Sequence, residues 1–192
     1  MPEEPRITGH SCFGMIYLTA MGTLWFLVLD YFHADKTKGR EQTKFPGGRG
    51  IGEEKRSRTL ERVLNDDLQE ESDSGGLSFW PSDSFEILVP DDTDSHASYQ
   101  KIFTLIPLSR CDGRLRRDEK EETDQTLLGV PRLVRVDDLA GEDGVLYDSH
   151  KVGLAHAIIG LIAQGGHNLS GISQEIIDWA KEVVTHYELK YR

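Results

Sequence analysis

The stretch of sequence that decides the fold runs from Phe45 to Glu71 and reads FPGGRGIGEEKRSRTLERVLNDDLQEE. Its first part, up to Gly52, contains Pro46 and is rich in glycine, a composition that predicts a loop. Its second part predicts an amphipathic helix from about Glu54 to Ser72, because leucine and valine recur at spacings of three and four. A glycine-rich loop therefore leads into a helix, and its glycine positions allow other groups to approach the backbone closely.

An acidic run from Asp66 to Glu71 closes the predicted helix. Because residues three and four apart share one face of a helix, Asp67 is expected beside Glu70 and Glu71. Like charges on one face repel each other, at a cost of roughly a few tenths of a kcal/mol per pair. Two explanations stay open. The run is either a solvated acidic helix end or a site where a hard cation such as Mg²⁺, which prefers oxygen ligands, offsets the repulsion.

The loop and the helix together resemble the Nudix box, the motif of the Nudix hydrolases. The box is a glycine, five residues, a glutamate, seven residues, and then Arg-Glu-apolar-any-Glu-Glu-any-Gly-apolar. Here Gly48 is followed after five residues by Glu54, and Phe45 to Gly48 resembles the usual approach to the box. The segment from Leu68 to Glu71 matches the apolar-any-Glu-Glu core, with Asp67 in place of the preceding glutamate.

This alignment contains a gap, because eleven residues separate Glu54 from Asp66 where the family has seven. The extra residues make about one helical turn, which would lengthen the helix with little rotation of its faces. Asp66 then occupies the arginine position, and Arg62 is its candidate substitute. An alignment without a gap keeps Arg62 as the arginine but loses the first glutamate at Val63, and it offers aspartates where glutamates belong. We prefer the gapped alignment and keep the ungapped one as the alternative.

The resemblance implies Mg²⁺-dependent hydrolysis of a phosphoanhydride bond in a nucleoside-diphosphate-linked compound. Carboxylates of the box would hold one or more Mg²⁺ or Mn²⁺ ions, which neutralise charge in the transition state and activate a water molecule. The predicted catalytic and metal-binding residues are Asp67, Glu70, Glu71 and Glu54, the last as a supporting ligand or as an anchor of the loop. The predicted contacts to the bound metal and phosphates are Gly48, through its carbonyl, and Arg49 and Lys44, which flank the loop.

A later loop often supplies a further carboxylate in this family, as a ligand or as a base. In this chain the charged segment from Arg110 to Gln125 offers four candidates, which are Asp118, Glu119, Glu121 and Glu122. The sequence does not choose among them, and a solvated charged loop is the alternative explanation for each.

Apolar runs rich in β-branched and aromatic residues predict strands around the box. The runs cover residues 12–19, 24–32, 85–89, 99–108 and 130–136. The first two are expected to form a hairpin with Met21 and Gly22 at its turn. Two helices close the chain, one from about Ser149 to Gln164 and the other from about Ser173, its candidate N-cap, to Leu189.

This order of elements predicts an α/β protein. The resemblance covers about residues 10–163 and implies a Nudix-like α/β/α sandwich with a mixed β-sheet and an added C-terminal helix. We expect a single domain over residues 1–192, with this core and a C-terminal helical extension over about 164–192.

The charge of the chain narrows the class of partners. The formal net charge is -11, which argues against a nucleic-acid scaffold, because such proteins usually carry a basic face. An anionic substrate is compatible with this charge if a divalent cation held by carboxylates recruits its phosphates. Cys12 and Cys111 lack a CxxC spacing, so we expect reduced thiols and a cytoplasmic location.

The apolar stretch from Cys12 to Phe32 is about long enough to span a bilayer. A turn signal from Thr19 to Thr23 and the charge of Asp30 favour two buried strands instead. A membrane-anchored protein is therefore the least favoured of three hypotheses.

The leading hypothesis is an active hydrolase. The second is a catalytically inactive Nudix-fold nucleotide-binding module, motivated by the missing arginine and the stretched helix. The expected partner is a small-molecule nucleoside diphosphate derivative, with no nucleic acid and no membrane, and a homodimer is left open.

Overall fold

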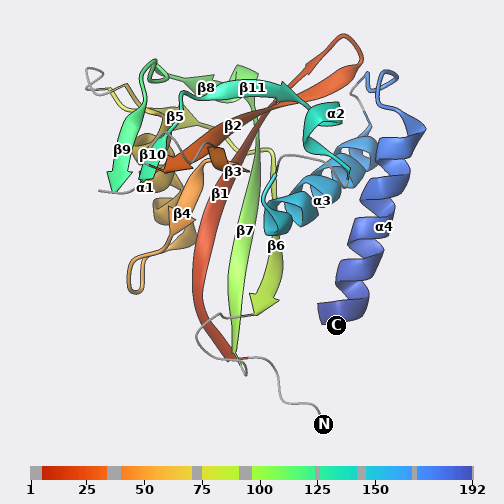
Figure 1. Ribbon diagram of the computed structural model, residues 1–192, viewed down its shortest axis with the longest axis horizontal. Helices are drawn as coiled ribbons and strands as arrows, with labels where there is room; N and C mark the ends of the chain where they lie inside the picture. The colour runs from red at the N-terminus through yellow and green to blue at the C-terminus, as the bar shows by residue number, and fades with distance from the viewer. Residues whose placement is uncertain are drawn as a thin grey trace.

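The computed structural model describes residues 6–33, 40–70, 75–90, 97–123, 126–141, 146–165 and 168–191. A mixed β-sheet forms its centre (Figure 1). Helix α1 (Arg56–Leu68) packs on one face of the sheet, and helices α3 (Asp148–Gln164) and α4 (Gln174–Tyr191) pack on the other. The predicted α/β class, with a mixed sheet between helical layers and an added C-terminal helix, is confirmed.

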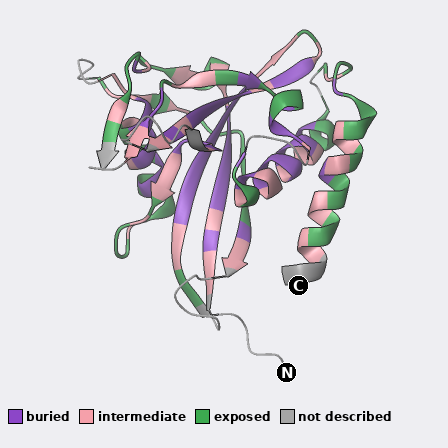
Figure 2. Ribbon diagram, viewed as in Figure 1, coloured by how far each residue is buried: buried purple, intermediate pink, exposed green. Residues whose placement is uncertain are grey.

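Side chains alternate along the central strands, which gives each face of the sheet its own apolar core. On β1 (Arg6–Ala20), Phe13, Met15 and Tyr17 pack in the core that contains α3. Cys12 and Ile16 of the same strand pack in the core that contains α1. Figure 2 shows the buried residues gathered along the middle of the sheet and on α3. The central strands are therefore covered on both faces.

Strands β1 and β2 (Thr23–His33) form the predicted hairpin, with Tyr17 opposite Phe26. Met21 and Gly22 at its turn have positive φ angles of 54° and 77°, a backbone that two-residue hairpin turns use. The prediction of two strands, rather than a membrane helix, is therefore confirmed. Within the described ranges, no helix is long and apolar enough to cross a membrane.

The main strands of the sheet follow the order β6-β7-β1-β2-β10-β9. β1 runs parallel to β7 (Ala97–Pro107), which is antiparallel to the edge strand β6 (Asp83–Pro90). On its other side, β1 pairs first with β4 (Gly47–Arg49) and then with β2. This arrangement places the glycine-rich segment next to the middle of the sheet.

Shorter elements complete the fold. The remaining strands are β3 (Arg40–Lys44), β5 (Ser78–Phe79), β8 (Cys111–Asp112), β9 (Lys120–Thr123), β10 (Thr126–Leu128) and β11 (Arg132–Arg135). Two short helical turns are the 3₁₀ helix η2 (Leu108–Arg110) and α2 (Val136–Leu139). β9 and β10 form an antiparallel hairpin beside β2.

The two C-terminal helices occupy the predicted positions. Ser173 caps α4 as expected, because its hydroxyl accepts the N–H of Ile176 at 3.3 Å. The Tyr187 hydroxyl donates to the carbonyl of Leu88 at 3.0 Å and accepts the Leu88 N–H at 2.6 Å. Helix α4 thereby covers backbone groups of the edge strand β6, which would otherwise be available to pair with another chain.

Helix α1 is shorter than the predicted helix from Glu54 to Ser72, which is wrong at both ends. Gln69 has an extended backbone, with φ −70° and ψ 140°, and it bridges to Leu115. The N–H of Glu70 then donates to the carbonyl of Arg114 at 3.0 Å. Pairing with a distant segment therefore ends the helix, although the local spacing would have allowed it to continue.

Candidate functional site

The prediction of a loop up to Gly52 is wrong at Gly47–Arg49, because these residues form strand β4. Strand β4 pairs with β1, with Gly47 opposite Phe13 and Gly48 opposite Cys12. Gly47 has a φ angle of 150°, and a Cβ atom at this position would clash with the backbone carbonyl of Cys12. Glycine is the residue that combines this backbone with so close an approach. On the other side, Gly48 lies close to Val63 of helix α1. The segment is therefore packed between the sheet and the helix.

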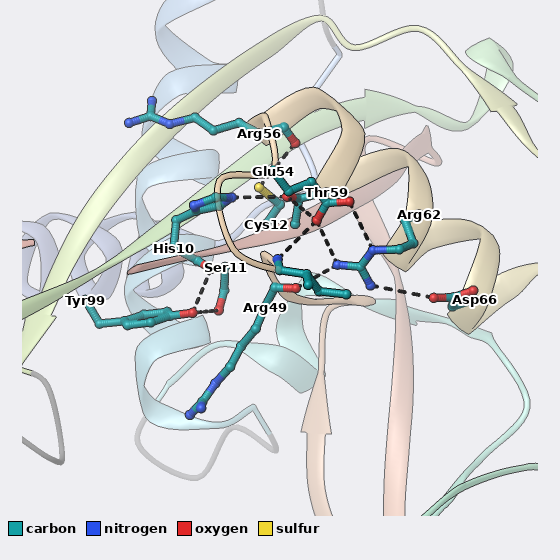
Figure 3. A network of polar contacts seen from close by, with 11 residues as sticks. His10, Ser11, Cys12, Arg49, Glu54, Arg56, Thr59, Arg62, Asp66 and Tyr99 are labelled. Carbon is teal, nitrogen blue, oxygen red and sulfur yellow. Dashed lines mark hydrogen bonds and ion pairs between the residues drawn. The ribbon is translucent and has the colours of Figure 1, made fainter. Parts of the chain in front are cut away.

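The glycine-rich segment from Phe45 to Gly52 is called the glycine loop below. An ion pair between Glu54 and Arg62 joins the end of this loop to helix α1 (Figure 3). The Arg62 guanidinium donates to Glu54 from Nε at 3.2 Å and from Nη2 at 2.9 Å, and Nη2 also donates to the Arg49 carbonyl at 2.8 Å. Glu54 accepts further hydrogen bonds from the Thr59 hydroxyl at 2.9 Å and the Ile51 N–H at 3.3 Å. These bonds, that of Arg62 above all, lower the pKa of Glu54 from 4.5 to about 2.

The end of helix α1 favours the alignment of the box without a gap. The ion pair of Arg62 with Glu54 agrees with both alignments, because each gives Arg62 the role of the box arginine. The preferred gapped alignment required a longer helix, and α1 ends at Leu68. Of the two roles predicted for Glu54, its contacts are those of an anchor of the loop.

The predicted acidic face of the helix is also corrected. Asp67 lies in the last turn of α1, whereas Glu70 lies beyond the helix and does not share its face. Glu71 lies outside the described residues. The ungapped alignment instead brings Asp66 and Asp67 to the positions of the paired glutamates.

A cleft of about 340 Å³ lies between the glycine loop, helix α1 and the β9-β10 hairpin. The loop contributes Gly47, Gly48 and Arg49 to its lining. The helix contributes Arg62, Val63, Asp66 and Asp67, and the hairpin contributes Lys120, Glu121 and Leu128. Three chain segments that are distant in the sequence therefore meet around one space.

The two aspartates of the cleft have different environments. Asp67 is 8% exposed, and its Oδ2 accepts the N–H of Gly47 at 2.7 Å. The side chain of Asp66 is 62% exposed, and its Oδ2 lies 3.7 Å from Nη1 of Arg62. Val63, at the position of the first glutamate of the box, is 5% exposed and apolar. The cleft therefore combines one anchored and one accessible carboxylate.

The carboxylates of the cleft are the residues that could hold a metal ion. In the part of the chain that the structure describes, no three Asp, Glu, His or Cys side chains form a group that could hold a metal ion. Asp66, Asp67 and Glu121 nevertheless line one cleft. Mg²⁺ is usually bound by one or two carboxylates plus waters and substrate phosphates. The available donors fit this mode of binding better than a preformed cage.

One of the four downstream candidates, Glu121, lines the cleft. Asp118 and Glu119 are not among the lining residues, and the side chain of Glu122 lies outside the described part of the structure. Of the candidates whose side chains the structure describes, Glu121 is therefore the one that β9 brings to the cleft.

The two basic residues predicted to contact phosphate lie at different places. Arg49 lines the cleft, but its guanidinium is 5.6 Å from the centroid of the Tyr99 ring, and Figure 3 shows the side chain directed away from the Glu54 and Arg62 pair. Lys44 is not among the lining residues, and its Nζ lies 4.3 Å from the centroid of the Tyr31 ring.

Arg116 is a residue that sequence reasoning missed. It is 7% exposed, and burial lowers the pKa of its guanidinium from the ordinary value. It donates to four backbone carbonyls, those of Asp67 at 2.5 Å, Asp118 at 2.6 Å, Gly129 at 2.7 Å and Leu128 at 3.4 Å. Arg116 therefore joins the end of α1 to the β9-β10 hairpin. The sequence did not predict this role, because a single arginine in a charged segment belongs to no repeating pattern.

Comparison with known proteins identifies the fold. No family model matches the sequence, and no curated protein matches it. Among solved structures, a C. elegans Ap4A hydrolase in a binary complex has a TM-score of 0.52 at 11% identity, over 80% of this chain and 100% of that chain.

Two further solved structures agree. The E. coli ORF135 protein has a TM-score of 0.52 at 13% identity, over 84% of this chain and 95% of that chain. A NUDIX hydrolase from Nitrosomonas europaea has a TM-score of 0.51 at 11% identity, over 80% of this chain and 90% of that chain. The chain therefore has the fold of the Nudix hydrolases, and identities this low carry the likeness no further than the fold.

Proposed function

We propose that the chain uses Mg²⁺ or Mn²⁺ to hydrolyse a phosphoanhydride bond of a nucleoside-diphosphate-linked small molecule in this cleft. The observation that carries the proposal is the 2.9 Å ion pair between Arg62 and Glu54. It holds the glycine loop against the helix that bears Asp66 and Asp67. The likeness of the fold to Nudix hydrolases supports the same conclusion.

The residues of the cleft have different proposed roles. Asp66, Asp67 and Glu121 are the candidates for holding the cation, which, when bound, supplies positive charge to the diphosphate and lowers the pKa of a bound water. The Gly47 N–H holds Asp67 in place before any ligand arrives, and such preorganisation favours catalysis. Asp66, the more exposed carboxylate, is the candidate for orienting the attacking water. Gly47 and Gly48 leave room for phosphate oxygens because they have no side chains.

The test is a substrate panel with matched variants. Nucleoside diphosphate sugars, dinucleoside polyphosphates and nucleoside triphosphates are incubated with Mg²⁺ and with Mn²⁺, and the released phosphate products are measured. We expect Asp67→Asn to lower turnover by roughly 100-fold, the usual scale for loss of one charged transition-state contact. The control Glu70→Gln should retain native turnover, because Glu70 is not among the residues that line the cleft. Native turnover in Asp67→Asn would rule out the proposed site.

A catalytically inactive nucleotide-binding module is the second candidate. One observation favours it, which is that buried Val63 stands at the position of the first glutamate of the box. The same panel separates the two candidates if binding is measured by calorimetry beside turnover. Binding of a panel member without release of product, under both metals, would favour the module.

A further inference from the structure

Lys120, the first residue of β9, places an ammonium group in the cleft that the sequence did not lead us to expect. Its Nζ donates to the carbonyl of Asp66 at 2.5 Å, and the residue lines the cleft together with Asp66 and Asp67. The contact joins residues that are 54 positions apart in the chain. A positive charge therefore lies within the group of carboxylates.

The position of this ammonium is set by the end of helix α1. The last carbonyls of a helix lack partners within it, and here each of them accepts a donor. Asn65 accepts the Gln69 N–H at 3.0 Å, Asp66 accepts Lys120, Asp67 accepts Arg116 Nε at 2.5 Å, and Leu68 accepts the Arg116 N–H at 2.8 Å. A cation near a helix C-terminus is also stabilised by the helix dipole. The ammonium group of Lys120 is thus positioned by a backbone carbonyl, that of Asp66.

An ammonium has three N–H donors, and the Asp66 carbonyl accepts one of them in this geometry. Within the described residues, that carbonyl is the acceptor seen for this ammonium, and Lys120 lines the cleft in which a ligand would lie. A diphosphate carries several negative charges, and a positively charged donor forms strong hydrogen bonds with phosphate oxygens. The carboxylates of the cleft provide cation ligands, whereas the side chain of Val63 provides none.

We propose that Lys120 binds the diphosphate directly and supplies a fixed positive charge beside a single divalent ion. The inference rests on the proposed function of the same cleft. It is supported by the contact of Lys120 with the Asp66 carbonyl beside the carboxylates of the cleft and by the apolar side chain at Val63, which offers no cation ligand. The chain then needs one cation from solution, because a lysine provides the second positive charge.

A purely structural role for Lys120 as a helix cap is the alternative, and three substitutions separate the two roles. Lys120→Gln keeps a donor for the Asp66 carbonyl but removes the charge. Lys120→Arg keeps both, and Lys120→Met removes both. Lys181→Gln, at an exposed site on α4, is the matched control. Circular dichroism and thermal unfolding confirm that each variant is folded.

The readout is binding of methylenediphosphonate, a diphosphate that cannot be hydrolysed, in the presence of Mn²⁺. Calorimetry gives the affinity, and electron paramagnetic resonance counts the Mn²⁺ ions bound per chain. We expect one ion per native chain. We expect Lys120→Gln and Lys120→Met to weaken binding by about tenfold to 100-fold, the scale of a charge-assisted hydrogen bond. The affinities of Lys120→Arg and Lys181→Gln for the diphosphonate should lie within about threefold of the affinity of the native protein.

Other outcomes overturn the inference in distinguishable ways. Native affinity in Lys120→Gln would show that Lys120 acts as a cap alone, and two Mn²⁺ ions per native chain would refute the single-ion site. Both results leave the proposed function intact. A native protein that binds neither Mn²⁺ nor the diphosphonate would overturn the proposed function and this inference together.

Discussion

Replacing Arg116 by methionine is expected to destabilise the protein strongly, because the guanidinium is buried and bonded to carbonyls from several segments. Three of its hydrogen bonds are short, those to Asp67, Asp118 and Gly129, at 2.5 to 2.7 Å. A buried carbonyl left without a donor costs about 1–3 kcal/mol. Removing the charge recovers part of this cost, because the guanidinium no longer has to be desolvated.

The expected net loss for Arg116→Met is about 3–5 kcal/mol, a large part of the roughly 5–15 kcal/mol typical of a domain. Arg116→Lys should lose about 2 kcal/mol, because an ammonium cannot reproduce the planar fork of donors. Urea unfolding followed by tryptophan fluorescence gives the free energy of unfolding. Arg117→Met, at an exposed neighbouring position, is the control. Equal stability of the Arg116→Met and Arg117→Met variants would refute the role of Arg116 as the link between α1 and the β9-β10 hairpin.

Three further outcomes follow from the same structure. Gly47→Ala should lower the free energy of unfolding by about 1–3 kcal/mol through backbone strain. It should also abolish turnover, because the new Cβ would clash with the Cys12 carbonyl. Native turnover in this variant would count against the close approach of the loop to β1. The Glu54 carboxyl has its pKa lowered to about 2, so its contribution to stability is complete above pH 4.5 and is lost as the pH falls toward 2. The stability difference between the native protein and Glu54→Gln, measured by urea unfolding at several pH values, should therefore shrink across that window, and a constant difference would contradict the ion pair. Tyr187→Phe should cost about 1–2 kcal/mol by removing the hydroxyl that serves the Leu88 backbone, and hydrogen exchange at Leu88 should quicken; unchanged exchange would mean that α4 does not protect the edge strand.

Local patterns were sufficient for much of the fold. The hairpin of β1 and β2 could be predicted because apolar β-branched runs flank a turn at Met21 and Gly22, and turn chemistry acts over a few residues. The C-terminal helices could be predicted for the same reason, since helical spacing and an N-cap at Ser173 are local signals. Gly47 and Gly48, which carried part of the resemblance, line the cleft.

The composition of the site depended on contacts that no local pattern contains. Helix α1 ends at Leu68 because Gln69 and Glu70 pair with backbone near Arg114 and Leu115. Glu70 therefore does not share a helix face with Asp67, as the sequence had predicted.

The sequence by itself determined the type and order of the longer elements, because periodicity and turn residues act over short distances, but it did not predict short strands such as β4 and β9. Tertiary structure decided which charges meet, because β9 brings Lys120 and Glu121 to the cleft beside the end of α1. Contacts between these charged side chains depend on how the strands pair and how the helix is capped, and both are properties of the folded chain.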